Sequence, residues 1–308
     1  MRNHTVILGA GGFIGRHLVN ALAPVSKKLT ALVRHPIDFG YANVETVTGE
    51  FKAPEDFSAV LTPGCDVVHL ASVSTPGSSA GKPTPELQGN IQITTALLEA
   101  LQNRSDAKLL YMSSGGSLYS GNIEGEASES SPVNPRSYHG AGKFASEWFI
   151  SAWCQQYEAT ATALRPSNIY GPGQPERAGF GIIPAALGKT IRGEMLPIWG
   201  DGTTVRDYLY IDDLISLCLK IVESPMPRGF SVLNAGSGLG ISLNELLDLV
   251  EKVTRMPLTR QYTCSRVVDA KRVVLDNNLA RSRYGWMPAT TIARGLEQTW
   301  NSYRLTHR

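Results

Sequence analysis

The sequence predicts a doubly wound α/β fold, built on a parallel sheet and followed by a smaller C-terminal lobe. Short apolar segments typical of buried strands alternate with segments of helical periodicity along the first half of the chain. A glycine-rich turn joins the first predicted strand to the first predicted helix. The length of 308 residues accommodates one large α/β domain with an appended lobe.

The composition is that of an ordinary globular protein. Hydrophobic residues make up 42% of the chain, charged residues 18%, and the formal net charge is +2. So small a charge gives no reason to expect nucleic acid or a membrane as a partner. The four cysteines have no C-x-x-C pair and no histidine at metal spacing, so we expect reduced thiols and no metal site. The apolar run at 6–10 is too short for a signal sequence, which makes a cytoplasmic location the expectation.

The segment 9–15, Gly-Ala-Gly-Gly-Phe-Ile-Gly, predicts a dinucleotide-binding turn of the Rossmann type. It follows a predicted strand at 5–9 and opens a predicted helix at 13–22. Glycines in this context allow a tight turn and close approach of the backbone to a pyrophosphate, and the helix N-terminus offers free N–H groups to the phosphates. The residues expected at the cofactor are Gly9, Gly12, Phe13, Ile14 and Gly15.

The end of the second predicted strand, 29–33, bears on the choice of cofactor. An acid there would bind the 2′-hydroxyl of the adenosine ribose, but the chain has Arg34 and no acid before Asp38. Arg34 would pair with a 2′-phosphate, which favours NADP, or lie in solvent or on the adenine, which leaves NAD open. We therefore expect NAD or NADP.

Other residues that border the cofactor are expected at the carboxyl ends of the strands, where doubly wound sheets bind their ligands. A third strand is predicted at 44–47, a fourth at 66–71 and a fifth at 109–114, with a helix over 87–102. The residues placed beside the cofactor on this basis are Glu50, Phe51, Leu70, Ala71, Ser72, Asn90 and Pro166.

The segment 137–143, Ser-Tyr-His-Gly-Ala-Gly-Lys, carries the most chemical information. It opens a predicted helix that runs from Lys143 to Tyr157. His139 lies four residues before Lys143, and residues four apart share one helix face. A tyrosine in that place would have its pKa lowered by the ammonium, as general acid–base chemistry near neutral pH requires. Here Tyr138 lies five residues before the lysine.

A collinear series of motifs runs along nearly the whole chain. Its segments are 9–15, 69–71, 113–119, the helix at Lys143, 164–173, 198–202, 205–213 and the helix that follows Ser242. The series resembles the extended short-chain dehydrogenase/reductases, and among them the NAD-dependent epimerase/dehydratase family, in particular bacterial UDP-sugar 4-epimerases. The resemblance implies hydride transfer between a sugar carbon and a nicotinamide. It also implies a catalytic tyrosine, a lysine four residues on, and a serine or threonine at the sugar hydroxyl.

The tyrosine of that family is displaced here. Lys143 matches the family's lysine without gaps on its C-terminal side, so His139 occupies the tyrosine position. Three hypotheses are open: a distorted first turn brings Tyr138 into the site, His139 is the acid–base group with a reference pKa of about 6.5, or the chain binds its ligands without turnover. The Lys143 ammonium would disfavour an imidazolium, which counts against the second.

The serine or threonine of the family is also replaced. Its position corresponds to Gly115, and Ser114 and Ser117 are the candidates to substitute for it. Family dehydratases carry an acidic pair beside this position, whereas this chain has Gly115 and Gly116. The sequence therefore favours a nucleotide-sugar 4-epimerase that acts through a transient 4-keto sugar. An NADP-dependent 4-reductase, favoured by Arg34, is the alternative.

The same resemblance assigns the C-terminal lobe to the nucleotide sugar, expected to be UDP-linked. Residues 1–170 would form the dinucleotide-binding domain and 171–308 mainly the substrate lobe, with 205–219 and 231–234 returning to the first. Arginines are expected to pair with the diphosphate. The substrate-binding candidates are Asn168, Arg177, Trp199, Arg206, Arg266 and Asp269.

Pairing of two helices into a four-helix bundle is common in the family and implies a homodimer. The helices would be those at 87–102 and 142–157. Phe149 and Trp153, four residues apart, would form an apolar stripe on the second helix or belong to the core. In the lobe, Ser242 and Glu245 predict a capping box at the start of a helix over 242–253.

Overall fold

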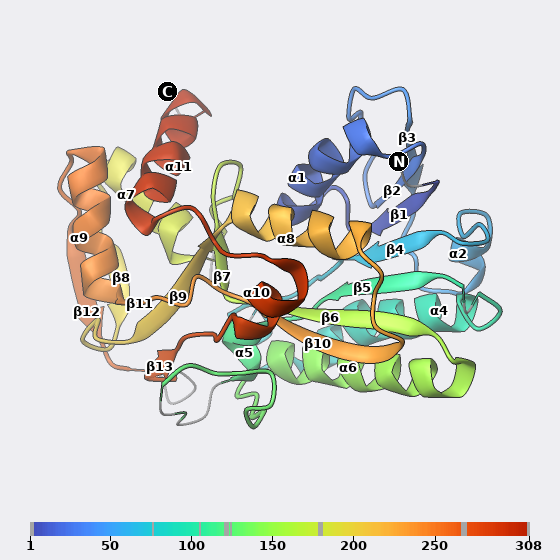
Figure 1. The fold of residues 1–308 in the computed structure, drawn as a ribbon. Helices are drawn as coiled ribbons and strands as arrows, with labels where there is room; N and C mark the ends of the chain where they lie inside the picture. Colours follow the sequence, from blue (N-terminus) through green and yellow to red (C-terminus); the bar gives the residue numbers. More distant parts are fainter. Residues whose placement is uncertain are drawn as a thin grey trace.

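The structure is a computed structural model that describes residues 3–75, 77–104, 106–119, 123, 125–177, 181–265 and 270–306. It comprises a parallel sheet between two layers of helices and a smaller lobe beside the sheet (Figure 1). The predicted doubly wound α/β class is confirmed.

The main sheet has seven parallel strands in the order β10-β6-β5-β4-β1-β2-β3. The chain builds outward from β1 in one direction and then continues from β4 in the other, so the strand order reverses between these two neighbours. Ligands of such sheets bind at this crevice, outside the carboxyl ends of the strands. The strands are β1 (Thr5–Leu8), β2 (Leu29–Val33), β3 (Val44–Thr48), β4 (Asp66–His69), β5 (Lys108–Met112), β6 (Thr160–Pro166) and β10 (Gly229–Ala235).

Helices cover both faces of the sheet (Figure 1). Alternate side chains of β1 enter two different cores, since Ile7 packs with α1 (Phe13–Leu22) and α8 (Ile211–Glu223), while Val6 packs with α4 (Gln92–Ala100) and α6 (Tyr138–Tyr157). Burial on both faces explains why β1 and β2 read as nearly continuous apolar runs. Shorter helical segments are η1 (Ala23–Val25), α2 (Glu55–Ser58), α3 (Pro83–Glu86), the π-helical turn η2 (Leu87–Ile91) and α5 (Gly115–Leu118).

The smaller lobe is built on a second sheet of four strands. Its order is β11-β9-β13, with β7 paired to β9. A separate two-stranded sheet joins β8 to β12. The elements are β7 (Asn168–Tyr170), α7 (Ile182–Arg192), β8 (Leu196–Trp199), β9 (Val205–Tyr210), β11 (Gly240–Ser242), α9 (Leu243–Thr254), β12 (Arg260–Thr263), β13 (Arg272–Val273), α10 (Asn278–Tyr284) and α11 (Ile292–Thr306).

Residues 231–234 lie in β10 of the main sheet, as expected, and α8 packs against α1. Residues 205–210 differ from the expectation, because they form β9 of the second sheet. The helix expected over 87–102 begins earlier, as α3, and passes through the π turn before α4. Helix α6 begins at Tyr138, five residues before the expected start, because Ser137 caps it.

Two further observations concern surfaces. Trp153 is buried in the core, while Phe149 is 49% exposed, so the two do not form one stripe. Among the helices of the described residues, none is long and apolar enough to cross a membrane.

The capping box at α9 is confirmed. The Ser242 hydroxyl accepts from the Glu245 N–H at 3.2 Å, and the Glu245 carboxylate accepts from the Ser242 N–H at 2.8 Å. We predict that Ser242→Ala lowers the free energy of unfolding by about 1 kcal/mol, because one N–H of the first turn loses its acceptor. Urea unfolding measures this. Ser242→Thr, which keeps the oxygen, is the control, and equal losses in both variants would contradict the prediction.

Candidate active site

The glycine turn has the geometry that a dinucleotide requires. Gly9 has φ +87°, and a Cβ there would lie 2.7 Å from the backbone N of Ala71, so only glycine permits this contact of β1 with β4. A Cβ at Gly15 would overlap the Gly9 carbonyl oxygen, which keeps α1 close to the strand.

The N-terminus of α1 fits an anion. Its first turn begins after Gly12 with Phe13 and Ile14, and among the described residues it has no acid and no capping side chain. The first N–H groups of a helix without such a cap offer hydrogen bonds and a partial positive charge. These features fit the pyrophosphate of a dinucleotide.

The residues that follow β2, where the adenosine ribose is expected, include an exposed arginine. Arg34 follows the strand and is exposed. Asp38, the next acid, accepts from the N–H of Gly40 at 2.8 Å and so serves a local turn. Among the described residues, the end of β2 therefore provides an exposed guanidinium and no carboxylate.

Of the two residues expected beside the adenine, only one faces solvent. Glu50 is exposed and pairs with Lys52 at 3.1 Å. Phe51 is buried, has φ +54°, and packs its ring 5.7 Å from that of Phe57. Its ring therefore belongs to the core.

The loop after β4 is fixed by Asn90. Leu70 is bonded through its N–H to Leu8, and Ala71 adjoins Gly9. Ser72 is exposed, and the N–H of Val73 donates to Oδ1 of the buried Asn90 at 2.8 Å. Asn90 thus holds the strand end that borders the glycine turn. Pro166, at the end of β6, pairs in register with Ala235 of β10.

Helix α6 presents a buried polar stripe to the carboxyl edge of the sheet. His139, Lys143 and Glu147 follow each other at intervals of four residues, and all three are buried. The first turn is regular α-helix, capped by Ser137, whose hydroxyl accepts from the Gly140 N–H at 3.1 Å. Tyr138 is 46% exposed, against 8% for His139.

Lys143 is anchored to the end of β5. Its ammonium donates to the carbonyl oxygen of Met112 at 2.8 Å and lies 5.0 Å from the centroid of the Tyr111 ring. Burial lowers the pKa of Lys143 to about 8, although the Glu86 and Glu147 carboxylates oppose this effect.

His139 lies in a polar environment of its own. Its Nδ1 is 2.9 Å from the hydroxyl of Ser74, and its backbone N–H donates to the hydroxyl of Ser79 at 3.2 Å. Burial, and then the Lys143 ammonium, lower the pKa of the imidazole to about 3. The ring is therefore neutral at physiological pH, with a lone pair on one nitrogen, and both effects oppose its protonation.

Two serines flank the position where the family has its serine or threonine. The hydroxyl of Ser114 donates to that of Ser117 at 3.1 Å across α5. A side chain at Gly115 would require Leu275 to move, because its Cβ would lie 2.7 Å from Cδ1 of Leu275 and 3.1 Å from the carbonyl oxygen of Arg165. Leu275 of the C-terminal lobe therefore occupies the space that the family's serine or threonine side chain would take.

Glu147, the last residue of the stripe, forms a buried ion pair with Arg165. Arg165 of β6 donates Nε–H and Nη2–H to the two oxygens of Glu147, at 3.0 and 2.6 Å. Its Nη1 donates to the hydroxyl of Tyr119 at 2.7 Å, and the Ser113 hydroxyl donates to Glu147 at 2.5 Å. All these groups are buried, so α6 is fixed to β5 and β6.

Of the residues expected to bind the substrate, the fold brings Asn168 and the strand of Arg206 into contact. Asn168 donates to the carbonyl oxygen of Asp207 at 2.8 Å and so lies against the strand that carries Arg206. Arg206 is half-buried, and its Nη1 donates to the carbonyl of Val205 at 2.9 Å. Trp199 and Arg177 are exposed on the lobe. Arg266 and Asp269 lie outside the described residues.

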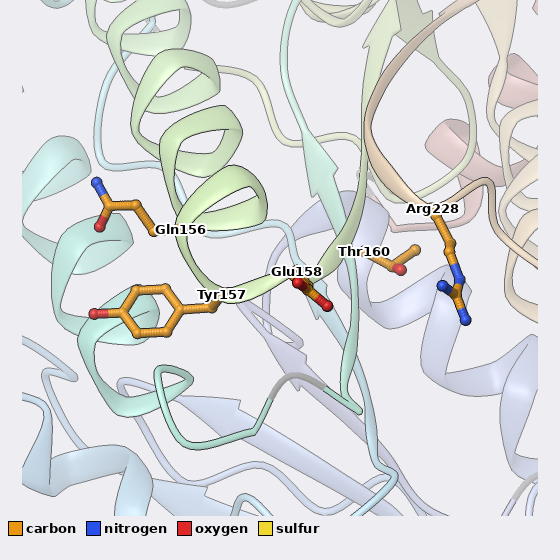
Figure 2. Close-up of a pocket in the computed structure, with 5 residues that line it drawn as sticks. All are labelled: Gln156, Tyr157, Glu158, Thr160 and Arg228. Carbon is orange, nitrogen blue, oxygen red and sulfur yellow. The ribbon is translucent and has the colours of Figure 1, made fainter.

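A surface hollow elsewhere is remote from this chemistry. It has a volume of about 520 Å³ and surrounds the C-terminal end of α6, about 27 Å along the helix from His139 (Figure 2). It lies at the amino end of β6, the edge of the sheet opposite the glycine turn. Its lining residues are Gln156, Tyr157, Glu158, Thr160 and Arg228.

The lowered pKa of Lys143 predicts a pH dependence of stability. Between pH 8 and 10.5 the unfolded chain holds this proton more tightly than the folded chain. The free energy of unfolding should therefore rise across that window, by on the order of 3 kcal/mol.

Lys143→Met should remove this rise, and urea unfolding at pH 8, 9 and 10 measures it. Lys189→Met, which alters only a surface pair with Glu194, is the control. An unchanged slope in Lys143→Met would show that the lysine titrates as an exposed one.

Comparison with known proteins identifies the family of the chain. The chain matches the NAD dependent epimerase/dehydratase family over residues 5–236. It is 29% identical over 313 residues to a UDP-glucose 4-epimerase of Mycolicibacterium smegmatis, covering 97% of this chain and 98% of that one. It is 24% identical over 313 residues to a dTDP-4-dehydro-6-deoxyglucose reductase of Escherichia coli, covering 98% of each.

Among solved structures, a UDP-glucose 4-epimerase of Thermotoga maritima with UDP-glucose superimposes with a TM-score of 0.91 at 27% identity, over 99% of this chain and 100% of that one. MoeE5 in complex with UDP-glucose and NAD superimposes with a TM-score of 0.88 at 28% identity, with the same coverage. The chain therefore belongs to the NAD dependent epimerase/dehydratase family.

Proposed function

We propose that this protein is an NAD-dependent nucleotide-sugar 4-epimerase whose substrate is UDP-linked and whose acid–base residue is His139. One observation carries the proposal. His139 and Lys143 are buried one turn apart on α6, and Lys143 contacts Met112, at the sheet edge where the glycine turn lies. The family and its UDP-glucose-binding relatives support the cofactor and the substrate class.

Each part of the site has a separate role in the proposed reaction. When bound, NAD supplies the hydride acceptor and donor for the sugar carbon. The N-terminus of α1 and the glycine turn bind its pyrophosphate, and Lys143 positions its ribose. His139 takes the proton of the 4-hydroxyl as the 4-keto sugar forms and returns it after the sugar has presented its other face.

Dehydration and reduction fit the site less well. Elimination of water needs an acid and a base at neighbouring carbons, and positions 115 and 116 are glycines. A 4-reductase is the second candidate, because Arg34 is exposed where an NAD-selective acid is expected and one relative is a reductase. Net loss of NADPH with a 4-keto nucleotide sugar would favour that candidate.

The choice between His139 and Tyr138 is tested by two variants. His139→Gln should lower the rate of UDP-glucose and UDP-galactose interconversion by about 10²- to 10⁴-fold, because the proton acceptor is lost. Tyr138→Phe, the matched control on the exposed side of the same turn, should change it less than about threefold. NMR of the sugar anomeric protons, without added NAD, measures the rate.

The opposite ranking would make Tyr138 the acid–base residue. Inertness of the wild type toward UDP-glucose, UDP-N-acetylglucosamine and UDP-glucuronate, with NAD retained, would make the chain a binding protein.

A homodimer is part of the proposal. Trp148 and Phe149 are 64% and 49% exposed on the outer side of α6, one of the two helices expected to pair. Contact with a second copy of the chain would remove these two apolar side chains from water. Trp148→Glu should shift the mass measured by light scattering from dimer to monomer, whereas Glu223→Gln on α8, outside both pairing helices, should not. A monomeric wild type would refute the dimer.

A further inference from the structure

A hydrogen-bonded cluster of polar side chains, two of them buried, adjoins His139. Ser74 follows β4, Glu86 ends α3, and Asn90 lies in the π turn. Glu86 is 3% exposed and Asn90 4%. A carboxylate is rarely buried this deeply without a role, since desolvation of a charge is costly.

Hydrogen-bond donors and acceptors in this cluster can be assigned individually. The backbone N–H of Val73 donates to one end of the Asn90 amide, which must be its oxygen. The other end is therefore the NH₂ group, and its two protons go to the Ser74 hydroxyl at 2.8 Å and to Oε1 of Glu86 at 2.6 Å. Ser74 gives its own proton to Oε2 of Glu86.

This assignment decides the tautomer of His139. Because the only proton of the Ser74 hydroxyl is used by Glu86, the hydroxyl is an acceptor toward Nδ1 of His139, 2.9 Å away. Nδ1 therefore carries the proton. In the neutral ring Nε2 is then the nitrogen with the free lone pair.

Helix α6 is shaped to admit the carboxylate. A Cβ at Gly142 would overlap Oε1 of Glu86, so any other residue there would displace it. The charged groups around the cluster are Lys143 and Glu147 of α6, Glu86 of α3 and Arg165 of β6, and Arg165 is already paired with Glu147. Glu86 is thus the carboxylate of this group that is not paired with Arg165, and it raises the pKa of Lys143.

We propose that Glu86, acting through Ser74, is a positioning residue that fixes His139 in the Nδ1–H tautomer and directs Nε2 toward the sugar hydroxyl. This rests on the proposed epimerase function. In the forward step the O–H bond of the 4-hydroxyl breaks and an Nε2–H bond forms. The C4–H electron pair leaves as hydride to NAD, and a C4 carbonyl results. The imidazolium then faces the Glu86 carboxylate through Ser74.

The tautomer itself is the first test. Two-bond ¹H–¹⁵N NMR of the histidine-labelled protein, with His139→Gln to assign the signals, should show Nδ1 protonated in the wild type. Glu86→Gln should shift His139 toward the Nε2–H tautomer, because its amide can donate to Ser74 and release the serine proton. A protonated Nε2 in the wild type, or an unchanged tautomer in Glu86→Gln, would overturn the proposal.

Steady-state kinetics of Ser74 variants distinguishes a positioning role of this serine from a role in folding. Ser74→Ala should lower kcat about 10- to 100-fold with little change in KM, and Ser74→Thr, which keeps the hydroxyl, should restore most of it. Equal losses of kcat in Ser74→Ala and Ser74→Thr, with unchanged melting temperatures, would contradict the positioning of His139 by Glu86 through Ser74. If the expected tautomers appear in a protein that epimerises none of the UDP-sugars, the positioning stands and the proposed function fails.

Discussion

The ion pair between Glu147 and Arg165 is the interaction on which the site depends. It joins α6 to β6 with two hydrogen bonds in a buried place, and Ser113 and Tyr119 satisfy the remaining polar atoms. Loss of one partner of such a pair typically costs about 3–5 kcal/mol, because the other charge is left buried. The pair therefore determines which face of α6 is turned to the sheet.

Once that face is set, the helical repeat determines the rest. Lys143 and His139 lie one and two turns from Glu147 on the same stripe, so both are withdrawn from water. Burial lowers both pKa values, which leaves a neutral imidazole next to a lysine of reduced basicity. Each remaining polar group then needs a partner, and Ser74, Glu86 and Asn90 provide them.

Local patterns in the sequence predicted the glycine turn, the α9 cap and the shared helix face of His139 and Lys143. Each of these is set by residues close together in the chain. Glu86 and Ser74 could not be found in this way, because only packing brings them to His139, 53 and 65 residues away. The filling of the Gly115 space by Leu275 and the place of β9 likewise depend on the C-terminal lobe.

The central claim is that a histidine held by this buried stripe replaces the tyrosine of the family. A crystal structure of the protein with NAD and UDP-glucose measures it most directly. We expect Nε2 of His139 within about 2.6–3.2 Å of the sugar 4-oxygen, with Tyr138 in solvent. The Tyr138 hydroxyl at that oxygen, with His139 turned away, would contradict the account.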